Sequence, residues 1–386
     1  MLSFRTAFCV FLLAGAACAS AQTGPAPAPA QAAPQPPADI SITPDEARQT
    51  ATQLAALLEE NYVFPDVAKR YAAMLRANAA GGAYDGFTSG RALAEKLTAD
   101  LRAVSPDNHL RVRAGQPPAA RGAPAQAAAA GAPQPQRRAY PFEPIEEARW
   151  LAPGIAYIRF NLFPGDAETV AAVDRFMKEH AAAKAIIFDN RTHHGGGLAE
   201  MNAMFPYLFA RPTTLVRMDT RASVDRAGGN PVEEDSRLRL VPSRAEVVSR
   251  DHYVEPSKTQ KSLFGAKVFV LTSGATASAA EHMTLSLKRT HRAVIVGETT
   301  AGAGNYGGQN PVGDKFSVFV PVGRTYDPDT GKGWEGSGID PDVAVPADRA
   351  LYEALVRSGV AAADAERIGG EVKPKGSMTR RTPRAG

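Results

Sequence analysis

Short apolar runs alternate with helical patterns between residues 155 and 300. The apolar runs are IAYIRFNLF, AIIFDNR, KVFVLTS and AVIVGETT, each of strand length. The segment AETVAAVDRFMKEHAA separates the first two runs, and a helical pattern from Ala279 to Arg289 separates the last two. Strands that alternate with helices predict an α/β core with a sheet that is parallel in part. We place this core at residues 139–348, followed by a C-terminal helix and basic tail at 349–386.

A helical unit is predicted before the core, over residues 42–113. Thr43 reads as a helix cap that is followed by a first-turn proline and two acidic residues. Further helices are expected over Val67–Asn78 and Ser89–Val104. Residues 114–138 are rich in proline and alanine and predict a low-complexity linker between the two units.

The first 21 residues have the three parts of a secretory signal peptide: a basic start, a short apolar stretch and small residues at Ala19 and Ala21. A Pro/Ala spacer over residues 22–41 follows, and it is expected to be disordered. The chain is therefore expected to be exported, to the periplasm or beyond, with no membrane span. A lipid anchor at Cys18 is disfavoured because the preceding Gly-Ala-Ala lacks the usual leucine.

Composition excludes several chemistries. Both cysteines, Cys9 and Cys18, lie in the signal peptide, so the mature chain would have no disulfide and no thiol nucleophile. The net charge is +4, but much of the excess sits in Arg137-Arg138 and the tail, without interleaved aromatic residues. We therefore expect no nucleic-acid partner.

Ser278 stands in LTSGATASAAEHM, between an apolar run and a helical pattern. A serine at a strand-to-helix turn can expose its hydroxyl as a nucleophile, with the amide of Ala279 aimed at an oxyanion. A serine there can equally be a plain helix cap. The segment alone leaves both readings open.

A glycine loop, Gly195–Gly197, follows the apolar run ending in DNRTHH. Glycines after a strand allow close approach of a ligand and aim amide groups at it. The phosphate-binding Gly-Lys-Ser/Thr and the dinucleotide GxGxxG patterns are both missing, and a simple glycine turn is the alternative. His193 and His194 are adjacent and would point to opposite sides of an extended segment, so no metal site is expected.

Four motifs in this order resemble the C-terminal-processing (tail-specific) serine peptidase family, and more closely its branch with the tricorn protease and the interphotoreceptor retinoid-binding protein. They are DNRTHHGGG, TSGATASAAE, VGETTAGAGN and EGSGIDPDV. The resemblance covers residues 42–345 apart from the insertion at 114–136. It implies a helical domain followed by a crotonase-like ββα core, and the insertion has too little regular pattern for a PDZ module.

The resemblance implies roles for particular residues. Ser278 stands at the nucleophile position, and Ala279, Gly195 and Gly196 stand where oxyanion-hole amides are expected. The tail-specific branch uses a lysine base where this chain has Ala303, which excludes the Ser–Lys dyad.

The tricorn-like branch uses a histidine and a glutamate instead, here His109 and Glu335. Their plain readings are a boundary histidine bonded to Asp107 and a surface acid beside Trp334. His193 replaces the asparagine usual in the glycine loop, and Asn190 replaces a leucine; His193 is the alternative base.

The prediction is an exported serine peptidase that cleaves a peptide or protein substrate through a Ser-His-Glu acyl-enzyme mechanism, without cofactor or metal. The rival is a non-catalytic protein that binds retinoid- or fatty-acid-like ligands on the same fold, because fold alone does not determine function. A degenerate partner that regulates another protease is the third alternative.

Overall fold

Two six-stranded sheets and the helices around them make up the described part of the chain. The computed structural model describes residues 39–107, 109–115, 140, 142–232 and 237–379. The expected signal peptide, and all but the ends of the expected spacer and linker, lie outside these residues. The described residues belong to one compact unit that begins at Asp39.

The predicted N-terminal helices are confirmed. They are α1 (Pro44–Asn61), α2 (Pro65–Ala80) and α3 (Gly90–Val104). Thr43 caps α1 in a reciprocal arrangement with Glu46, and the Ser89 hydroxyl caps α3. A proline at the first position of α1 and of α2 supplies a backbone angle that suits a helix start.

The predicted α/β core is confirmed as a sheet with the order β12-β9-β8-β4-β3-β2. All its pairs are parallel except that of β2 with β3. Its strands are β2 (Ile145–Ala152), β3 (Ile155–Phe160), β4 (Ala185–Asp189), β8 (Lys267–Thr272), β9 (Val294–Gly297) and β12 (Val343–Ala344).

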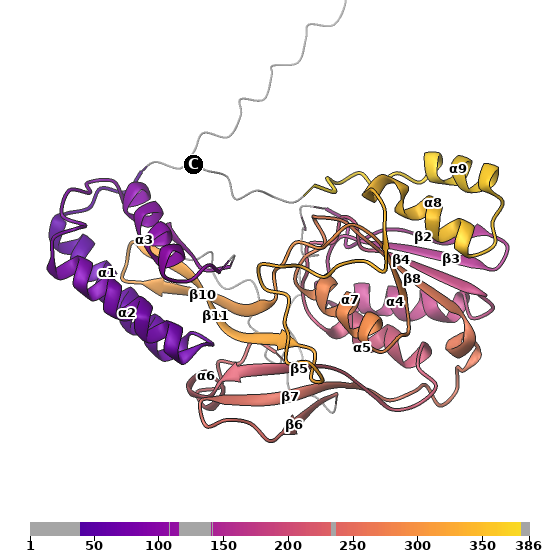
Figure 1. The fold of residues 1–386 in the computed structure, drawn as a ribbon, viewed down its shortest axis with the longest axis horizontal. Coiled ribbons are helices and arrows are strands. Elements are labelled where there is room, and N and C mark those ends of the chain that lie inside the picture. Colours follow the sequence, from indigo (N-terminus) through magenta and orange to yellow (C-terminus); the bar gives the residue numbers. More distant parts are fainter. Residues whose placement is uncertain (1–38, 108, 116–139, 141, 233–236, 380–386) are drawn as a thin grey trace, which may run out of the picture. The chain divides into compact units, whose positions relative to one another are not determined.

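Helices cover both faces of this sheet (Figure 1). One layer comprises α4 (Ala167–Glu179), α5 (Ala199–Met204) and α7 (Ala279–Arg289), and the other comprises α8 (Ala350–Arg357) and α9 (Ala362–Glu371). Side chains alternate between the layers along each strand. In β4, for example, Ile186 and Phe188 face the first layer, and Ala185 and Ile187 face the second. The central strands β3, β4 and β8 are therefore buried on both faces, as their unbroken apolar runs require.

The second sheet is antiparallel and was not predicted strand by strand. Its order is β1-β11-β5-β7-β6, with β10 also paired to β11. Its strands are β1 (Arg111–Ala114), β5 (Thr213–Arg221), β6 (Leu238–Val241), β7 (Val247–Val254), β10 (Asn305–Val312) and β11 (Phe316–Tyr326). Val318 and Val320 of β11 share one apolar core with α1, α2 and α3, so the helical part and the C-terminal hairpin stabilise each other.

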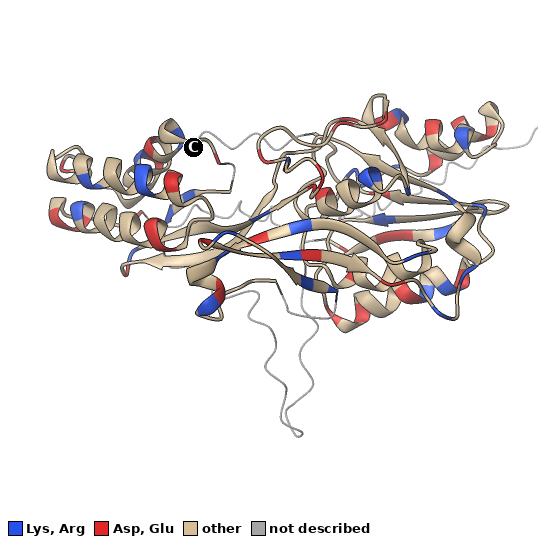
Figure 2. Cartoon of the chain, turned by 60° about the horizontal axis from the view of Figure 1, so that its bottom comes forward, with Lys and Arg blue, Asp and Glu red and all other residues tan. Residues whose placement is uncertain are grey.

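Charged residues of both signs are interspersed along the described helices and strands (Figure 2). Many are paired within one helix, such as Arg48 with Asp45 and Arg367 with Glu371. Of the described helices, none is both long and apolar enough to cross a membrane.

The carboxyl ends of β4, β8 and β9 lie at one edge of the core sheet, because the three strands are parallel neighbours. The three loops that leave this edge contain the DNRTHHGGG, SGATAS and GETTAGAG segments. In open α/β sheets this edge is where ligands bind. The motifs singled out in the sequence are therefore gathered here by the fold.

Candidate active site

Ser278 has a strained backbone at the turn between β8 and α7. Its φ is 56° and its ψ is −118°, a conformation that residues with a side chain rarely adopt. The other serine, threonine and aspartate caps, Thr43, Ser89 and Asp166, all have extended backbones. Capping alone needs no such strain, and strained residues of this kind cluster at functional sites. The conformation favours the nucleophile reading of Ser278 over the plain cap.

Glu281, one turn into α7, holds this strained turn through a fully buried carboxylate. Its Oε2 accepts the amides of Ser278 and Ala303, both at 2.8 Å. Its Oε1 accepts the hydroxyl of Thr300 at 2.6 Å and the amide of Gly302 at 2.7 Å. Burial raises the pKa of Glu281, although these four donors oppose the shift. The carboxylate thus joins the Ser278 turn to the loop after β9.

The glycine loop lies directly against Ser278. A Cβ atom at Gly195 would lie 2.7 Å from the Cβ and 3.2 Å from the Oγ of Ser278. A Cβ atom at Gly196 would lie 1.9 Å from the carbonyl oxygen of Phe163. Both glycines have positive φ, 106° and 130°. The two positions therefore require glycine for space and for conformation, and a simple turn does not explain this packing.

Two amides near Ser278 are available to a ligand. Within the described residues, no hydrogen bond uses the amide of Ala279, the first residue of α7, or that of Gly196. The amide of Gly195 differs from the prediction, because it donates to His193 Nδ1 at 3.0 Å. Gly195 thus provides close approach to Ser278, while its N–H is already occupied.

His193 is completely buried, and its ring packs edge-on against Phe163 at 4.2 Å between centroids. Burial lowers the pKa of His193 to about 3, and the charge of His194 adds to the shift. Its Nδ1 accepts the Gly195 amide, and its Nε2 is buried without a hydrogen-bond partner among the described residues. This ring is a poor base near neutral pH.

Hydrogen bonds fix the loop after β4 against the loop after β8. Ser273 Oγ donates to the carbonyl of Arg191 at 2.5 Å, and Thr276 Oγ1 donates to that of Asn190 at 2.8 Å. Asp189 accepts from the Arg191 guanidinium at 2.7 and 2.9 Å. Burial alone would raise the pKa of Asp189, but Arg191 and then Arg159 hold it well below its usual range. The aspartate and arginine of the motif are therefore structural anchors.

His109 and Glu335 are brought together from distant parts of the chain. His109 Nδ1 lies 3.5 Å from Glu335 Oε2, an ion-pair distance longer than a well-formed hydrogen bond. The imidazole stacks on Phe319 of β11 with 5.4 Å between ring centroids. The two side chains are 21% and 19% exposed, so Glu335 is not a free surface acid.

Asp107 binds the backbone amide of His109, whereas the imidazole ring of His109 faces Glu335. Asp107 Oδ1 accepts the amide of His109 at 2.8 Å. Its Oδ2 accepts the hydroxyl of Tyr62 at 2.9 Å and the side-chain amide of Asn305 at 3.0 Å. The alternative prediction, that His109 is bonded to Asp107, is thus correct for the backbone amide of His109 but not for its imidazole ring.

The pKa of His109 is raised. Burial alone would lower it, but Glu335 outweighs burial, and the charges of Asp107 and Glu281 add to its effect. A histidine with this surrounding can accept a proton and is stabilised once it carries one.

Asp107, His109 and Glu335 form the group among the described residues whose ligand atoms could surround one ion, since these atoms lie within 4.8 Å of one another. Their oxygens are already engaged, however. Glu335 Oε2 accepts the amides of Gly304 and Asn305 at 2.7 and 2.9 Å. A metal would have to displace these donors and those on Asp107, so the group fits an imidazole paired with a carboxylate better than a metal centre.

Fold and site together define an α/β protein that presents a strained serine where a strand turns into a helix. Residues 154–345 match the model described as peptidase family S41, and residues 39–142 match that of the N-terminal domain of peptidase S41 in eukaryotic IRBP. The chain belongs to peptidase family S41, which confirms the resemblance seen in the four motifs.

Several solved structures are similar to this chain over part of its length. The photosystem II D1 C-terminal processing protease is 19% identical over 68% of this chain and 53% of its own, with a TM-score of 0.39. A putative peptidase from Parabacteroides merdae is 16% identical over 87% of this chain and 98% of its own, with a TM-score of 0.49. The tricorn protease is 17% identical over 56% of this chain and 18% of its own, with a TM-score of 0.30. The chain thus covers about half the length of the processing protease.

Proposed function

We propose that this chain is an exported serine peptidase that cleaves peptide bonds through an acyl-enzyme, with Ser278, His109 and Glu335 as its catalytic residues. One observation carries the proposal. A single loop, Gly302–Asn305, donates amides to Glu281, which holds the Ser278 turn, and to Glu335, which faces His109. The loop joins the nucleophile side of the site to the base side.

Each residue has a distinct task in this mechanism. The Ser278 hydroxyl attacks the peptide carbonyl carbon, and its proton passes to the imidazole of His109. Glu335 stabilises the imidazolium that forms. The amides of Ala279 and Gly196 stabilise the oxyanion, and Gly195 gives the close approach that brings this loop to Ser278. His109 then protonates the leaving amine, and water, activated by the same imidazole, hydrolyses the acyl-enzyme.

Gly195 and His193 take revised roles in this proposal. Gly195 was predicted as an oxyanion donor, but its amide is held by His193, so Gly196 and Ala279 are the donors proposed. His193 is the alternative base, but burial lowers its pKa to about 3, which makes it a weak acceptor for the serine proton near neutral pH. His109, whose pKa is raised, supports the proposed mechanism better.

The test is labelling of the mature protein with a fluorophosphonate, paired with hydrolysis of a casein or nitrophenyl ester substrate. Wild type is expected to be labelled and active, whereas Ser278→Ala loses both signals and His109→Ala loses nearly all activity. His193→Asn, which restores the residue usual in the family, keeps labelling. Full activity of Ser278→Ala would make the mechanism wrong.

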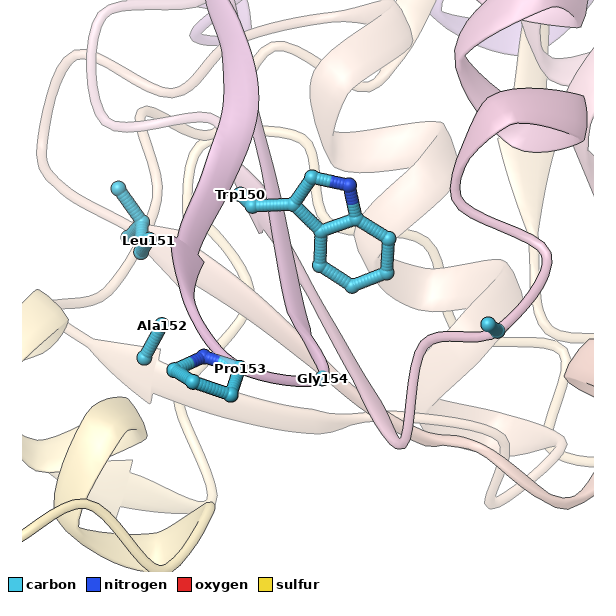
Figure 3. A pocket seen from close by; sticks show the side chains of 6 residues that line it. Trp150, Leu151, Ala152, Pro153 and Gly154 are labelled. Atoms are coloured by element: carbon cyan, nitrogen blue, oxygen red, sulfur yellow. The ribbon is translucent and has the colours of Figure 1, made fainter.

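The rival function is binding of an apolar ligand without catalysis. A hollow of about 280 Å³ is lined by Trp150, Leu151, Ala152, Pro153, Gly154 and Ala182 (Figure 3). It lies at the turn between β2 and β3, at the amino end of the parallel strands, whereas Ser278 follows their carboxyl end. A protein that binds fatty acid tightly and is never labelled at Ser278 would favour this rival.

Export is part of the proposal and rests on the signal-peptide pattern of residues 1–21. Expression of the full chain in a Gram-negative host is expected to yield a periplasmic or secreted product whose sequence starts at Gln22. A cytoplasmic product that keeps Met1 would contradict export without touching the peptidase proposal.

A further inference from the structure

The direction of the Gly196 amide is set by backbone pairing on the opposite side of the same peptide group. Phe163 donates its amide to the carbonyl of Gly195 and accepts the amide of Gly197, both at 2.8 Å. In a planar trans peptide, the carbonyl of Gly195 and the N–H of Gly196 point in opposite directions. The Phe163 backbone therefore aims the N–H that we assign to the oxyanion.

The segment that carries Phe163 is itself held by Glu200, the second residue of α5. Glu200 Oε1 accepts the amide of Gly165 at 2.7 Å, and its side chain is completely buried. Gly165 has a φ of 74°, so the chain turns at this point. The contacts close a ring that runs from the glycine loop through α5 and Glu200 to Gly165, and back through Phe163 to the glycine loop.

The carboxyl group of Glu200 is costly to keep in this place. Its Oε2 is buried and has no hydrogen-bond partner among the described residues. Burial, together with the charge of Asp166 at the start of α4, raises the pKa of Glu200 to about 7, although the hydrogen bond from the Gly165 amide opposes the shift. Met201 and Met204 in the same short helix are apolar and equally buried. An apolar side chain would serve packing better here, so packing does not explain the carboxyl group.

We propose that Glu200 is a positioning residue for the oxyanion hole: it clamps Gly165, and through Phe163 it aims the amide of Gly196. This inference rests on the proposed peptidase function. The clamp acts on the transition state, because only the oxyanion uses the Gly196 amide fully. It contributes to kcat and not to the fit of the substrate.

Glu200→Met removes the acceptor at nearly constant volume, and Glu200→Gln keeps an acceptor oxygen. We expect Glu200→Met to lower kcat about 10-fold or more, with KM within about 2-fold of wild type, because a misaligned donor loses part of the 10²–10³-fold effect of one oxyanion amide. Glu200→Gln should recover kcat to within about 3-fold of wild type by restoring the bond to Gly165.

Stability separates the clamp from a merely structural role. Folding raises the pKa of Glu200 from 4.5 to about 7. The protonated carboxyl therefore adds to the free energy of unfolding below pH 4.5, and this contribution is lost as the pH rises through 7. At pH 8 the ionised group opposes folding, and Glu200→Met should melt at the same temperature as wild type or higher. Ser286→Ala is the matched control, because it also removes a buried oxygen without a partner, outside the site. It should keep kcat.

Amide hydrogen exchange at Gly165 tests the clamp independently of catalysis. Exchange should be about 10-fold faster in Glu200→Met than in wild type or Glu200→Gln, because a lost hydrogen bond opens the turn. Unchanged exchange, unchanged kcat, a loss that appears in KM alone, or a melting temperature that falls together with kcat would each overturn the proposal. A wild-type protein without activity would contradict the peptidase function, and the exchange rates would still decide on the clamp.

Discussion

Glu281 and Glu335 accept the amides of two consecutive residues of one loop. Glu281 Oε2 binds the amide of Ala303 at 2.8 Å, and Glu335 Oε2 binds that of Gly304 at 2.7 Å. The first carboxylate also holds the amide of Ser278, and the second faces the imidazole of His109. We therefore expect that substitution of either glutamate affects both the Ser278 turn and the pair of His109 with Glu335. The two substitutions should differ in which measured quantity changes.

Glu335→Gln should shift the pH profile of activity. The base works when His109 is neutral, so kcat/KM rises as pH passes upward through the raised pKa of His109, and the wild-type midpoint should lie above 6.5. Glutamine keeps an acceptor for the loop amides but removes the charge that favours imidazolium. The midpoint should move to lower pH while the plateau falls about 100-fold or more. The pH dependence of kcat/KM checks this.

Glu366→Gln is the matched control for that profile. Glu366 is an exposed acid on α9 that pairs with Arg349, and its loss should leave midpoint and plateau unchanged. An unchanged midpoint in Glu335→Gln would show that Glu335 does not act on His109.

Glu281→Gln should lower stability and fluorophosphonate labelling together. Glutamine replaces one carboxylate oxygen by an NH₂ group, which then faces donors such as the amides of Ser278 and Ala303 or of Gly302. Buried amides without an acceptor cost about 1–3 kcal/mol each. Thr300→Val removes one of the four donors to Glu281 and also the acceptor of the buried Ile339 amide, so it should cost about 1–3 kcal/mol. Labelling should continue, because the amides of Ser278 and Ala303 keep their acceptor. Urea unfolding and labelling rates measure both effects, and equal behaviour of the two variants would contradict the special role of the carboxylate.

Much of the core could be predicted because its signals are local. The apolar runs of β3, β4 and β8 are buried on both faces, and Ala279–Arg289 is helical with the predicted bounds. The strands β5, β6 and β7 lie in one antiparallel sheet, and their pairing depends on contacts between distant segments. Their alternation is interrupted by charged pairs such as Arg217 with Asp251, so no periodic pattern predicted them.

The sequence motifs predict the residues of the candidate site, but they do not predict the hydrogen bonds among them. Ser278 and the glycine loop were recognised by their motifs, and the sequence also contains Glu281 and Glu200. The sequence does not indicate their roles, because both side chains bind backbone amides. Glu200 binds the amide of Gly165, and Glu281 binds the amides of Gly302 and Ala303. Backbone amides have no sequence pattern of their own. The engaged amide of Gly195 was missed for the same reason.

Gly196→Ala should reduce the labelling of Ser278 strongly, whereas Gly197→Ala should leave it nearly unchanged. A methyl group at Gly196 would lie 1.9 Å from the carbonyl oxygen of Phe163, on a residue with a φ of 130°. The loop must then move, and we expect labelling of Ser278 to fall about 100-fold or more, since a small misplacement can have that effect. At Gly197 the nearest atom of another segment is 4.0 Å away, and activity should stay within about 2-fold of wild type. Labelling rates of the two variants check this, and equal rates would contradict the assigned contact.

Ser278→Gly should be at least as stable as Ser278→Ala, although both abolish activity. At most positions glycine is less stable than alanine by about 0.4–1 kcal/mol, because the unfolded chain gains freedom. The φ of 56° at Ser278 imposes strain of about 1–3 kcal/mol on any residue with a Cβ atom, and glycine relieves it. The usual order is therefore expected to reverse by up to about 2 kcal/mol. Urea unfolding of the two variants measures the difference. If Ser278→Ala is the more stable by the usual margin, the turn is not strained, and the conformational argument for Ser278 as nucleophile loses its basis.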